Sequence, residues 1–178
     1  IESPVPWITA RNRPMVALML DSGIRQGEVC SLCIGNLYFD SSVMKVCGKG
    51  NKERFVPLGQ MSAKYLRDYL SIRPFKLQNV FVGLYGEPLT CSAIKTMTWN
   101  LQKHLPFEFS SHKLRHNFAT NYLLDQYAQF DQMDIYQLMS IMGHEDISTT
   151  RRYLHEASGI LAVKGCISHL DKIFLNSE

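Results

Sequence analysis

Long hydrophobic runs are missing from the sequence. The longest apolar stretches hold only a handful of residues, as in 15–20, whereas a helix that crosses a bilayer needs about 20. No membrane span is therefore expected. The first residues also lack an initiator Met and the charged and apolar regions of a signal peptide. We therefore expect an excised fragment of a longer protein, with one domain over residues 1–178.

Cysteines are few and form no disulfide framework. The five cysteines are an odd number and lie scattered along the chain, which favours reduced thiols and a cytoplasmic protein. Cys30 and Cys33 have the spacing of a zinc or redox pair, but a structural zinc site needs a second close pair of ligands. We expect buried thiols on a helix instead.

Charge of neither sign is in strong excess. There are 19 Lys and Arg residues and 16 Asp and Glu residues, which gives a net charge of +3 and a pI near 8.6. This balance permits a phosphate-rich partner without demanding one. At 178 residues, of which 46% are hydrophobic, the chain can bury one substantial core, and no repeat or linker divides it.

Hydrophobic periodicity predicts a mainly α fold with a small antiparallel β-sheet, an α+β class. Two strand-like runs at 43–47 and 54–58 flank a tip rich in Gly and Lys, which is typical of a hairpin, and 79–82 could add a third strand. The helices are expected at 9–20, 25–32, 60–72, 90–104, 112–126, 134–142, 148–157 and 159–174.

Four short segments combine basic residues, His or Tyr with turns marked by glycine. In the first, Arg25 follows the turn at Gly23, at the start of a helix, and Glu28 lies one turn later. A guanidinium at a helix start favours phosphate oxygens, and the carboxylate could hold it in place. Taken alone, the segment is more typical of a surface ion pair.

The second segment is the hairpin tip. Gly48 and Gly50 let the backbone approach another surface closely, and Lys49 between them can project into a site as an acid or a cation. A solvated charged turn is the ordinary alternative. The tip lacks the spacing and the Gly-Lys-Ser/Thr ending of a nucleotide-binding loop, so ATP is not implied.

The third segment starts a helix at about 112. His112 and Arg115 share one helical face, so an imidazole and a guanidinium can converge on one phosphate. His116 follows His112 by four residues, a spacing that also occurs in zinc sites. No Glu follows the first His, and Arg115 would set a permanent charge beside a metal, so we favour a packing or supporting role for His116.

The fourth segment joins a helix end at Gly143 to His144 in the turn and to Tyr153 on the next helix. A phenol has a reference pKa of about 10, so a nucleophilic Tyr needs cations nearby to stabilise its phenolate. The other three segments could supply them. For Tyr153 alone, an ordinary half-buried aromatic residue is the better interpretation, because seven other tyrosines compete with it.

In their order and spacing, the four segments resemble the tyrosine recombinases, or phage-type integrases. The resemblance covers about residues 8–155. It rests on the hairpin tip followed by Val-Pro-Leu, on the His-Lys-Leu-Arg-His run from His112, and on the Gly-His pair whose His precedes Tyr153 by nine residues. It implies the fold of a recombinase catalytic domain that cuts and rejoins DNA through a 3′-phosphotyrosyl intermediate.

The resemblance also implies catalytic roles. Arg25 and Arg115 would clamp the non-bridging oxygens of the scissile phosphate, which Tyr153 would attack. His112 would assist proton transfer and phosphate binding, and His144 would donate a further hydrogen bond to the phosphate.

The remaining roles are a general acid and two supporting residues. Lys49, with Lys52 as its rival, would protonate the departing 5′ oxygen. Glu28 would hold Arg25, and His116 would support the site without touching the phosphate. No metal, ATP or other cofactor is implied, because the phosphotyrosyl link conserves the bond energy.

The implied partner is double-stranded DNA, bound by a tetramer on paired sites. Such proteins usually carry an N-terminal DNA-binding domain, which we expect to be missing from this fragment. Residues 159–178 could be a C-terminal tail that docks on a neighbouring subunit, or they could pack on their own domain; the isolated fragment would be a monomer.

The resemblance leaves the biological setting open between a mobile genetic element and chromosome dimer resolution, and frequency alone favours a bacterial mobile genetic element. A phage, conjugative or transposable element would use the enzyme for integration or transposition in the cytoplasm, at the nucleoid. Alternative functions are a type IB topoisomerase-like enzyme or resolvase, a DNA-binding module that does not cut, and a metal hydrolase built on the histidines.

Overall fold

The structure, a computed structural model, describes residues 5–164, apart from the side chain of Lys49. The fold is mainly helical with one small antiparallel sheet, as predicted. In chain order the elements are α1 (Pro6–Ser22), α2 (Gln26–Ser31), the 3-10 turn η1 (Ile34–Asn36), β1 (Leu37–Tyr38), β2 (Val43–Cys47), the 3-10 turn η2 (Lys49–Asn51), β3 (Glu53–Pro57), α3 (Gln60–Ile72), α4 (Cys91–Gln102), α5 (Ser111–Phe130), α6 (Ile135–Met142) and α7 (Ile147–Lys164).

The sheet is an antiparallel hairpin with one additional strand. β2 and β3 pair from Val43 opposite Pro57 to Cys47 opposite Glu53, and β1 pairs with the other edge of β2. At the tip, Gly50 has a φ of +73°, a left-handed conformation that glycine adopts without strain. The predicted hairpin is therefore confirmed.

The strand expected at 79–82 is not formed. Its ends make only isolated bridges, between Cys33 and Asn79 and between Val82 and Pro88. Val80, Phe81 and Val82 are fully buried, so the apolar run that resembled a strand is a loop that crosses the core. The sequence alone does not separate these two cases, because both require the same buried apolar residues.

Helix ends follow local chemistry. α1 and α6 end at Gly23 and Gly143, each with a φ of +62°, which is the left-handed conformation of a glycine C-cap. The hydroxyl of Ser110 caps α5 by accepting the N–H of Lys113 (3.2 Å), and Asp134 caps α6 in the same way. These helix ends set the positions of the predicted site residues next to them, which are Arg25, His112 and His144.

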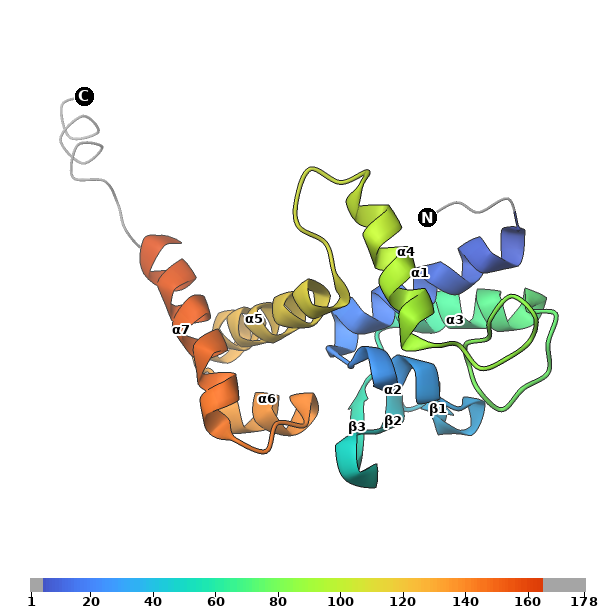
Figure 1. The fold of residues 1–178 in the computed structure, drawn as a ribbon. Coiled ribbons are helices and arrows are strands. Elements are labelled where there is room, and N and C mark those ends of the chain that lie inside the picture. The colour runs from blue at the N-terminus through green and yellow to red at the C-terminus, as the bar shows by residue number, and fades with distance from the viewer. Residues whose placement is uncertain (1–4, 165–178) are drawn as a thin grey trace.

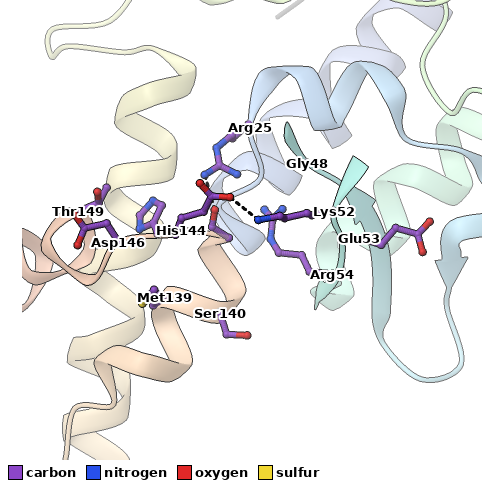
Figure 2. Close-up of a pocket in the computed structure, with 12 residues that line it drawn as sticks. Arg25, Gly48, Lys52, Glu53, Arg54, Met139, Ser140, His144, Asp146 and Thr149 are labelled. Atoms are coloured by element: carbon purple, nitrogen blue, oxygen red, sulfur yellow. Dashed lines mark hydrogen bonds and ion pairs between the residues drawn. The ribbon is translucent and has the colours of Figure 1, made fainter. Parts of the chain in front are cut away.

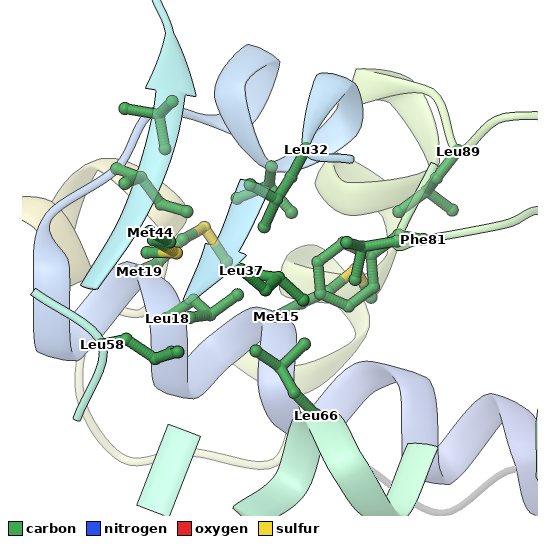
Figure 3. Packing of buried hydrophobic residues seen from close by; sticks show 14 of the residues in the cluster. Met15, Leu18, Met19, Leu32, Leu37, Met44, Leu58, Leu66, Phe81 and Leu89 are labelled. Carbon is green, nitrogen blue, oxygen red and sulfur yellow. The ribbon is translucent and has the colours of Figure 1, made fainter. Parts of the chain in front are cut away.

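Two clusters of buried side chains form the interior. The first lies among α1 to α4 and the sheet, and includes Met15, Leu18 and Leu66 (Figure 3). The second lies among α5, α6 and α7 and includes Phe118 and Leu138. α5 runs between these two parts of the molecule (Figure 1). The start of α5 therefore lies at the junction of the two clusters.

The C-terminal helix is longer than predicted. Two helices were expected, at 148–157 and 159–174, but α7 is continuous from Ile147 to Lys164 and passes through Gly159. A glycine inside a helix costs only about 1 kcal/mol, which the buried residues Thr150, Tyr153 and Ala157 of the same helix can offset. The rest of the expected tail, 165–178, lies outside the described residues. None of the helices within 5–164 is long and apolar enough to cross a membrane.

Candidate active site

A cavity of about 860 Å³ lies where the hairpin, the start of α2 and the α6–α7 turn meet. Figure 2 shows that Arg25, Lys52 and His144 approach it from these three directions. Its wall consists of Arg25, Gly48, Lys52, Glu53, Arg54, Met139, Ser140, Gly143, His144, Glu145, Asp146 and Thr149. Three of the four predicted segments thus contribute to one cavity, although they are far apart in the sequence.

The C-terminal end of α6 gathers three arginines. Arg54 Nε donates to the carbonyl of residue 141 (2.7 Å), Arg115 Nη2 to that of residue 142 (2.7 Å), and Arg25 Nη2 to that of residue 143 (2.9 Å). The last carbonyls of a helix have no partners within the helix and carry its partial negative charge. Three consecutive carbonyl groups therefore hold three guanidinium groups side by side.

Glu28 is the buried carboxylate of this cluster, with 3% of its side chain exposed. Its oxygens accept the backbone N–H of Arg25 (2.7 Å), Arg25 Nη1 (3.1 Å), and two N–H groups of Arg54 (2.6 and 2.9 Å). Burial alone would raise the pKa of Glu28, but these hydrogen bonds and both positive charges hold it below its usual value. Glu28 is therefore ionised and contacts Arg25, the residue that it was predicted to hold.

Arg115 projects from the first turns of α5 into the junction and is 7% exposed. Its Nη1 donates to the carbonyl of Gly23, and its Nη2 lies 3.1 Å from His144 Nε2. Burial, together with the neighbouring charges of Arg25 and Arg54, lowers the pKa of Arg115 to about 10, with Glu28 acting in the opposite direction. The guanidinium remains charged at neutral pH.

His144 is held in one tautomer. Because a guanidinium cannot accept a hydrogen bond, Nε2 of His144 must accept from Arg115, and Nδ1 carries the proton and donates to Thr150 Oγ1 (2.8 Å). Burial and the charges of the nearby arginines, Arg115 first, lower the pKa of His144 to about 4. The imidazole is therefore neutral at neutral pH.

Tyr153 lies between two imidazoles. Its ring is stacked on His144 with centroids 6.3 Å apart, and the ring of His116 meets it at 60° with centroids 5.0 Å apart. The phenol oxygen accepts a hydrogen bond from Arg152 Nη2 (2.8 Å). Only 1% of Tyr153 is exposed, because it shares the inward face of α7 with Thr150. The predicted nucleophile is thus inside the second cluster, next to the cavity wall.

His112 and His116 lie on the face of α5 that carries Arg115. His112 is exposed on the first turn, and burial together with the charges of Arg152, His116, Arg115 and Lys113 lowers its pKa. His116 Nε2 lies 2.7 Å from Oε2 of Glu156, which also accepts a hydrogen bond from Thr120. His116 thus contacts both Tyr153 and Glu156, and its supporting role stays a prediction.

The two candidate acids lie on the hairpin. Lys49 belongs to η2, and its side chain is outside the described part of the structure. Lys52 lines the cavity, and its Nζ pairs with Glu145 Oε1 at 2.6 Å, which raises the pKa of Lys52. The choice between Lys49 and Lys52 thus stays a prediction.

The metal-binding alternatives depend on how the cysteines and histidines are placed. Cys30 Sγ lies 3.7 Å from Cys91 Sγ, whereas Cys33 contacts the backbone of Ser31, so Cys30 and Cys33 do not face each other. The expectation of two buried thiols on a helix is wrong in part, because both are only partly buried and Cys33 lies after the end of α2. All four cysteines within the described chain are free thiols. Residues 5–164 contain no group of three or more His, Cys, Asp or Glu side chains placed to hold a metal ion.

Arg54, Arg152 and Glu156 contact predicted site residues but were not themselves predicted. Arg152 and Glu156 lie within four residues of Tyr153, so their proximity was readable from helical spacing. The inward position of Arg54 could have been predicted from strand alternation, which puts it on the same face as the buried Val56. A charged residue on the buried face of a strand requires a carboxylate partner, which here is Glu28.

Comparison with known proteins is consistent with this geometry. A family model described as "Phage integrase family" matches residues 6–159. The chain is 33% identical over 175 residues to "Tyrosine recombinase XerC" of Staphylococcus carnosus (strain TM300), and the match covers 94% of this chain and 54% of that protein. The chain spans about half the length of the curated relatives it matches.

Solved recombinase structures share the fold. The structure of XerA recombinase superposes with a TM-score of 0.75 at 27% identity, covering 90% of this chain and 60% of XerA. The structure of XerH site-specific recombinase, bound to a palindromic difH substrate in a post-cleavage complex, gives a TM-score of 0.74 at 23% identity, covering 94% of this chain and 48% of XerH. At the identity of the XerH match, the likeness shows the fold alone.

Proposed function

This chain belongs to the phage integrase family, and from that premise we propose that it cuts and rejoins DNA strands through a 3′-phosphotyrosyl intermediate. One observation carries the proposal: Arg25, Arg115 and His144 meet at a single turn, and Tyr153 stacks on His144. Guanidinium groups gathered beside a phenol are what a phosphoryl transfer from DNA to tyrosine requires.

Tyr153 is the proposed nucleophile. The phenol loses its proton, a transfer that His112 assists, and the oxygen attacks the scissile phosphorus. The bond between phosphorus and the 5′ oxygen breaks, and the departing oxygen takes a proton from Lys49 or Lys52. The free 5′ hydroxyl of a partner strand then attacks the phosphotyrosine and releases Tyr153. The number of phosphoester bonds is unchanged, so the reaction needs no ATP.

Arg25 and Arg115 are the proposed clamp on the non-bridging oxygens, and His112 assists proton transfer at the edge of the site. Arg25 is the more accessible arginine, since 40% of its side chain is exposed. His144 has a conditional role. It is neutral without DNA, and a bound phosphate would favour its protonated form, in which Nε2 can donate a hydrogen bond.

The proposed partner is double-stranded DNA, and the proposed assembly is a tetramer on paired sites. The recombinase XerH, which shares this fold, was solved bound to a difH substrate. We further propose that this chain is the catalytic part of a larger protein and that residues 159–178, the first six of which continue α7, contribute a docking tail. A mobile genetic element in a bacterium, acting in the cytoplasm at the nucleoid, is the proposed setting; free cysteines in the described chain suit that compartment.

The proposal is tested by trapping the covalent intermediate. The full chain is incubated with a nicked DNA site that loses its 5′ fragment after cleavage, and the adduct is measured on denaturing gels with and without EDTA. We expect an adduct that resists EDTA and is absent in Tyr153→Phe, because phenylalanine has no attacking oxygen.

Tyr136→Phe is the matched control. It likewise removes one phenol hydroxyl, but from an exposed tyrosine on α6. It should form the adduct at the parent rate. Arg25→Ala should slow the step on the order of 100-fold, as for the loss of one charge-stabilising donor. An adduct that persists in Tyr153→Phe assigns the nucleophile to another residue.

A further inference from the structure

Arg54 occupies an unusual place on the hairpin. It lies on β3 opposite Val46 of β2, and only 13% of its side chain is exposed. Strand alternation points it toward the interior together with Val56. Figure 2 shows Arg54 just below Lys52, with its side chain on the wall of the cavity. A buried guanidinium on a strand must be explained by its partners.

Each nitrogen of the Arg54 guanidinium donates a hydrogen bond to a protein acceptor. Nε donates to the carbonyl of residue 141, and Nη1 and Nη2 donate to the two carboxylate oxygens of Glu28. Three of the five N–H groups of the guanidinium are thus used, in a bidentate pair and a helix-end contact. Arg25 is much more exposed than Arg54. Arg25 is therefore suited to contact a phosphate, and Arg54 is not.

We infer that Arg54 is a positioning residue: it neutralises Glu28 and fixes the α6–α7 turn, so that Arg25 keeps its positive charge and its orientation for the scissile phosphate. The inference rests on the proposed function. Two guanidinium groups and one carboxylate leave one net positive charge in this cluster. Without Arg54, Glu28 would have Arg25 as its nearest counter-ion, and the clamp would lose its excess charge.

The same residue docks the hairpin onto the site. A Cβ atom at Gly48 would lie 3.3 Å from Glu28 Oε1 and 3.4 Å from Arg54 Nη1, so the hairpin backbone directly covers the pair. Gly48 precedes η2, which carries Lys49. The ion pair of Arg54 and Glu28 thus sets the position of the hairpin that carries both candidate acids.

The test separates the rate of cleavage from DNA affinity in the full chain. Arg54→Met removes the charge, Arg54→Lys keeps it with a single-point donor, and the nicked DNA site reports the adduct rate at saturating DNA. We expect Arg54→Met to lower this rate on the order of 100-fold, with a much smaller change in DNA affinity. Arg54→Lys should recover part of the loss, because lysine restores the charge but not the bidentate geometry.

Arg73→Met is the matched control. Like Arg54, Arg73 donates three hydrogen bonds, but its acceptors are the backbone carbonyls of Asn79, Val80 and Leu77. Arg73 is not among the residues that line the cavity. Arg73→Met should be less stable than the parent protein, but the fraction that is folded should form the adduct at the parent rate. A double variant, Glu28→Gln with Arg54→Met, should cleave faster than Arg54→Met alone, since it removes the carboxylate that would otherwise neutralise the charge of Arg25.

The outcomes are distinct. If the folded fraction of Arg54→Met cleaves like that of Arg73→Met, or if the double variant is no faster than the single one, the positioning role is overturned. If Arg54→Met does not fold, Arg54→Lys decides: a parent-like rate overturns the inference, and a loss on the order of tenfold supports it. A parent protein that forms no adduct contradicts the proposed function instead.

Discussion

Burial and, after it, the charges of the surrounding arginines keep His144 unprotonated. Its Nε2 accepts from Arg115 and its Nδ1 donates to Thr150, an arrangement that only the neutral ring can make. Burial is the main cause of its low pKa, about 4, and the nearby guanidinium charges add to it. The pKa of His112, on the outer edge of the site, is also lowered.

These pKa shifts predict a loss of stability in mild acid. A His with a pKa near 4 when folded and about 6.5 when unfolded takes up its proton first in the unfolded chain, so stability falls as pH decreases between these values. The full shift would correspond to about 3 kcal/mol. Solvent screening of the partly exposed ring reduces this, and we expect about 1 kcal/mol between about pH 7 and pH 5.

Thermal or urea unfolding at several pH values measures this effect. His144→Gln keeps a hydrogen-bonding side chain that does not titrate, so its stability should depend less on pH than that of the parent. His112 remains in both proteins and cancels in the comparison. Equal slopes for parent and variant would show that His144 does not carry the effect.

The sequence predicted which residues have the right chemistry, but not their partners. Arg25 with Glu28, and His112 with Arg115, were readable because helical spacing brings them together. The contact of Arg54 with the end of α6 joins residues 87 positions apart, and no local pattern encodes such a distance. Tyr153 could be distinguished from the other tyrosines only by family resemblance.

At the scale of single elements, the α6–α7 turn determines the geometry of the site. Gly143 ends α6 in a left-handed conformation, and the carbonyls at 141, 142 and 143 contact three arginines. A Cβ atom at Gly143 would lie 2.9 Å from Arg54 Cζ. That guanidinium is held by Glu28 and the helix end, so it cannot move aside freely.

Gly143→Ala should therefore cost more than a glycine substitution at another left-handed position. We expect a loss of about 2–4 kcal/mol from backbone strain and the contact with Arg54 together, measured by urea unfolding. Gly50→Ala is the matched control: its φ is +73° and its Cβ would have nothing within 4 Å, so only the backbone cost of about 1 kcal/mol applies. Equal losses in the two variants would contradict the contact with Arg54.

Elements with strong periodicity were predictable, and those decided by packing were not. α3 has the predicted bounds, because its apolar face repeats regularly between a loop and Pro74. The segment 79–82 was misread since a buried loop and a buried strand share their composition. α7 continues through Gly159, where tertiary contacts of the preceding turns outweigh the low helix propensity of glycine.

At the scale of the whole molecule, the site is assembled from both halves. Arg25 and Glu28 belong to the half that contains α1 to α4, whereas His144 and Tyr153 belong to the half built by α6 and α7. α5 contributes Leu114 to the first cluster and Phe118 to the second, so this helix fixes one half against the other. The sequence could name the residues of each half, but their convergence depends on this long-range packing.

The length of α7 allows the part of the proposed docking tail beyond Lys164 to be removed without disturbing the site. The helix reaches Lys164, well beyond Tyr153 and Ala157, so a chain that ends at Lys164 retains the buried face of α7 and its contacts with α5 and α6. If residues 165–178 dock on a neighbouring subunit, this truncation should lower the fraction of tetramer on paired DNA sites, measured by sedimentation, because each interface loses its inserted segment.

Adduct formation on a single nicked site is the control and should stay near the parent rate, since every residue of the proposed mechanism is present. An unchanged tetramer fraction would contradict docking in trans, and a matching loss of thermal stability would instead indicate that the segment packs on its own chain.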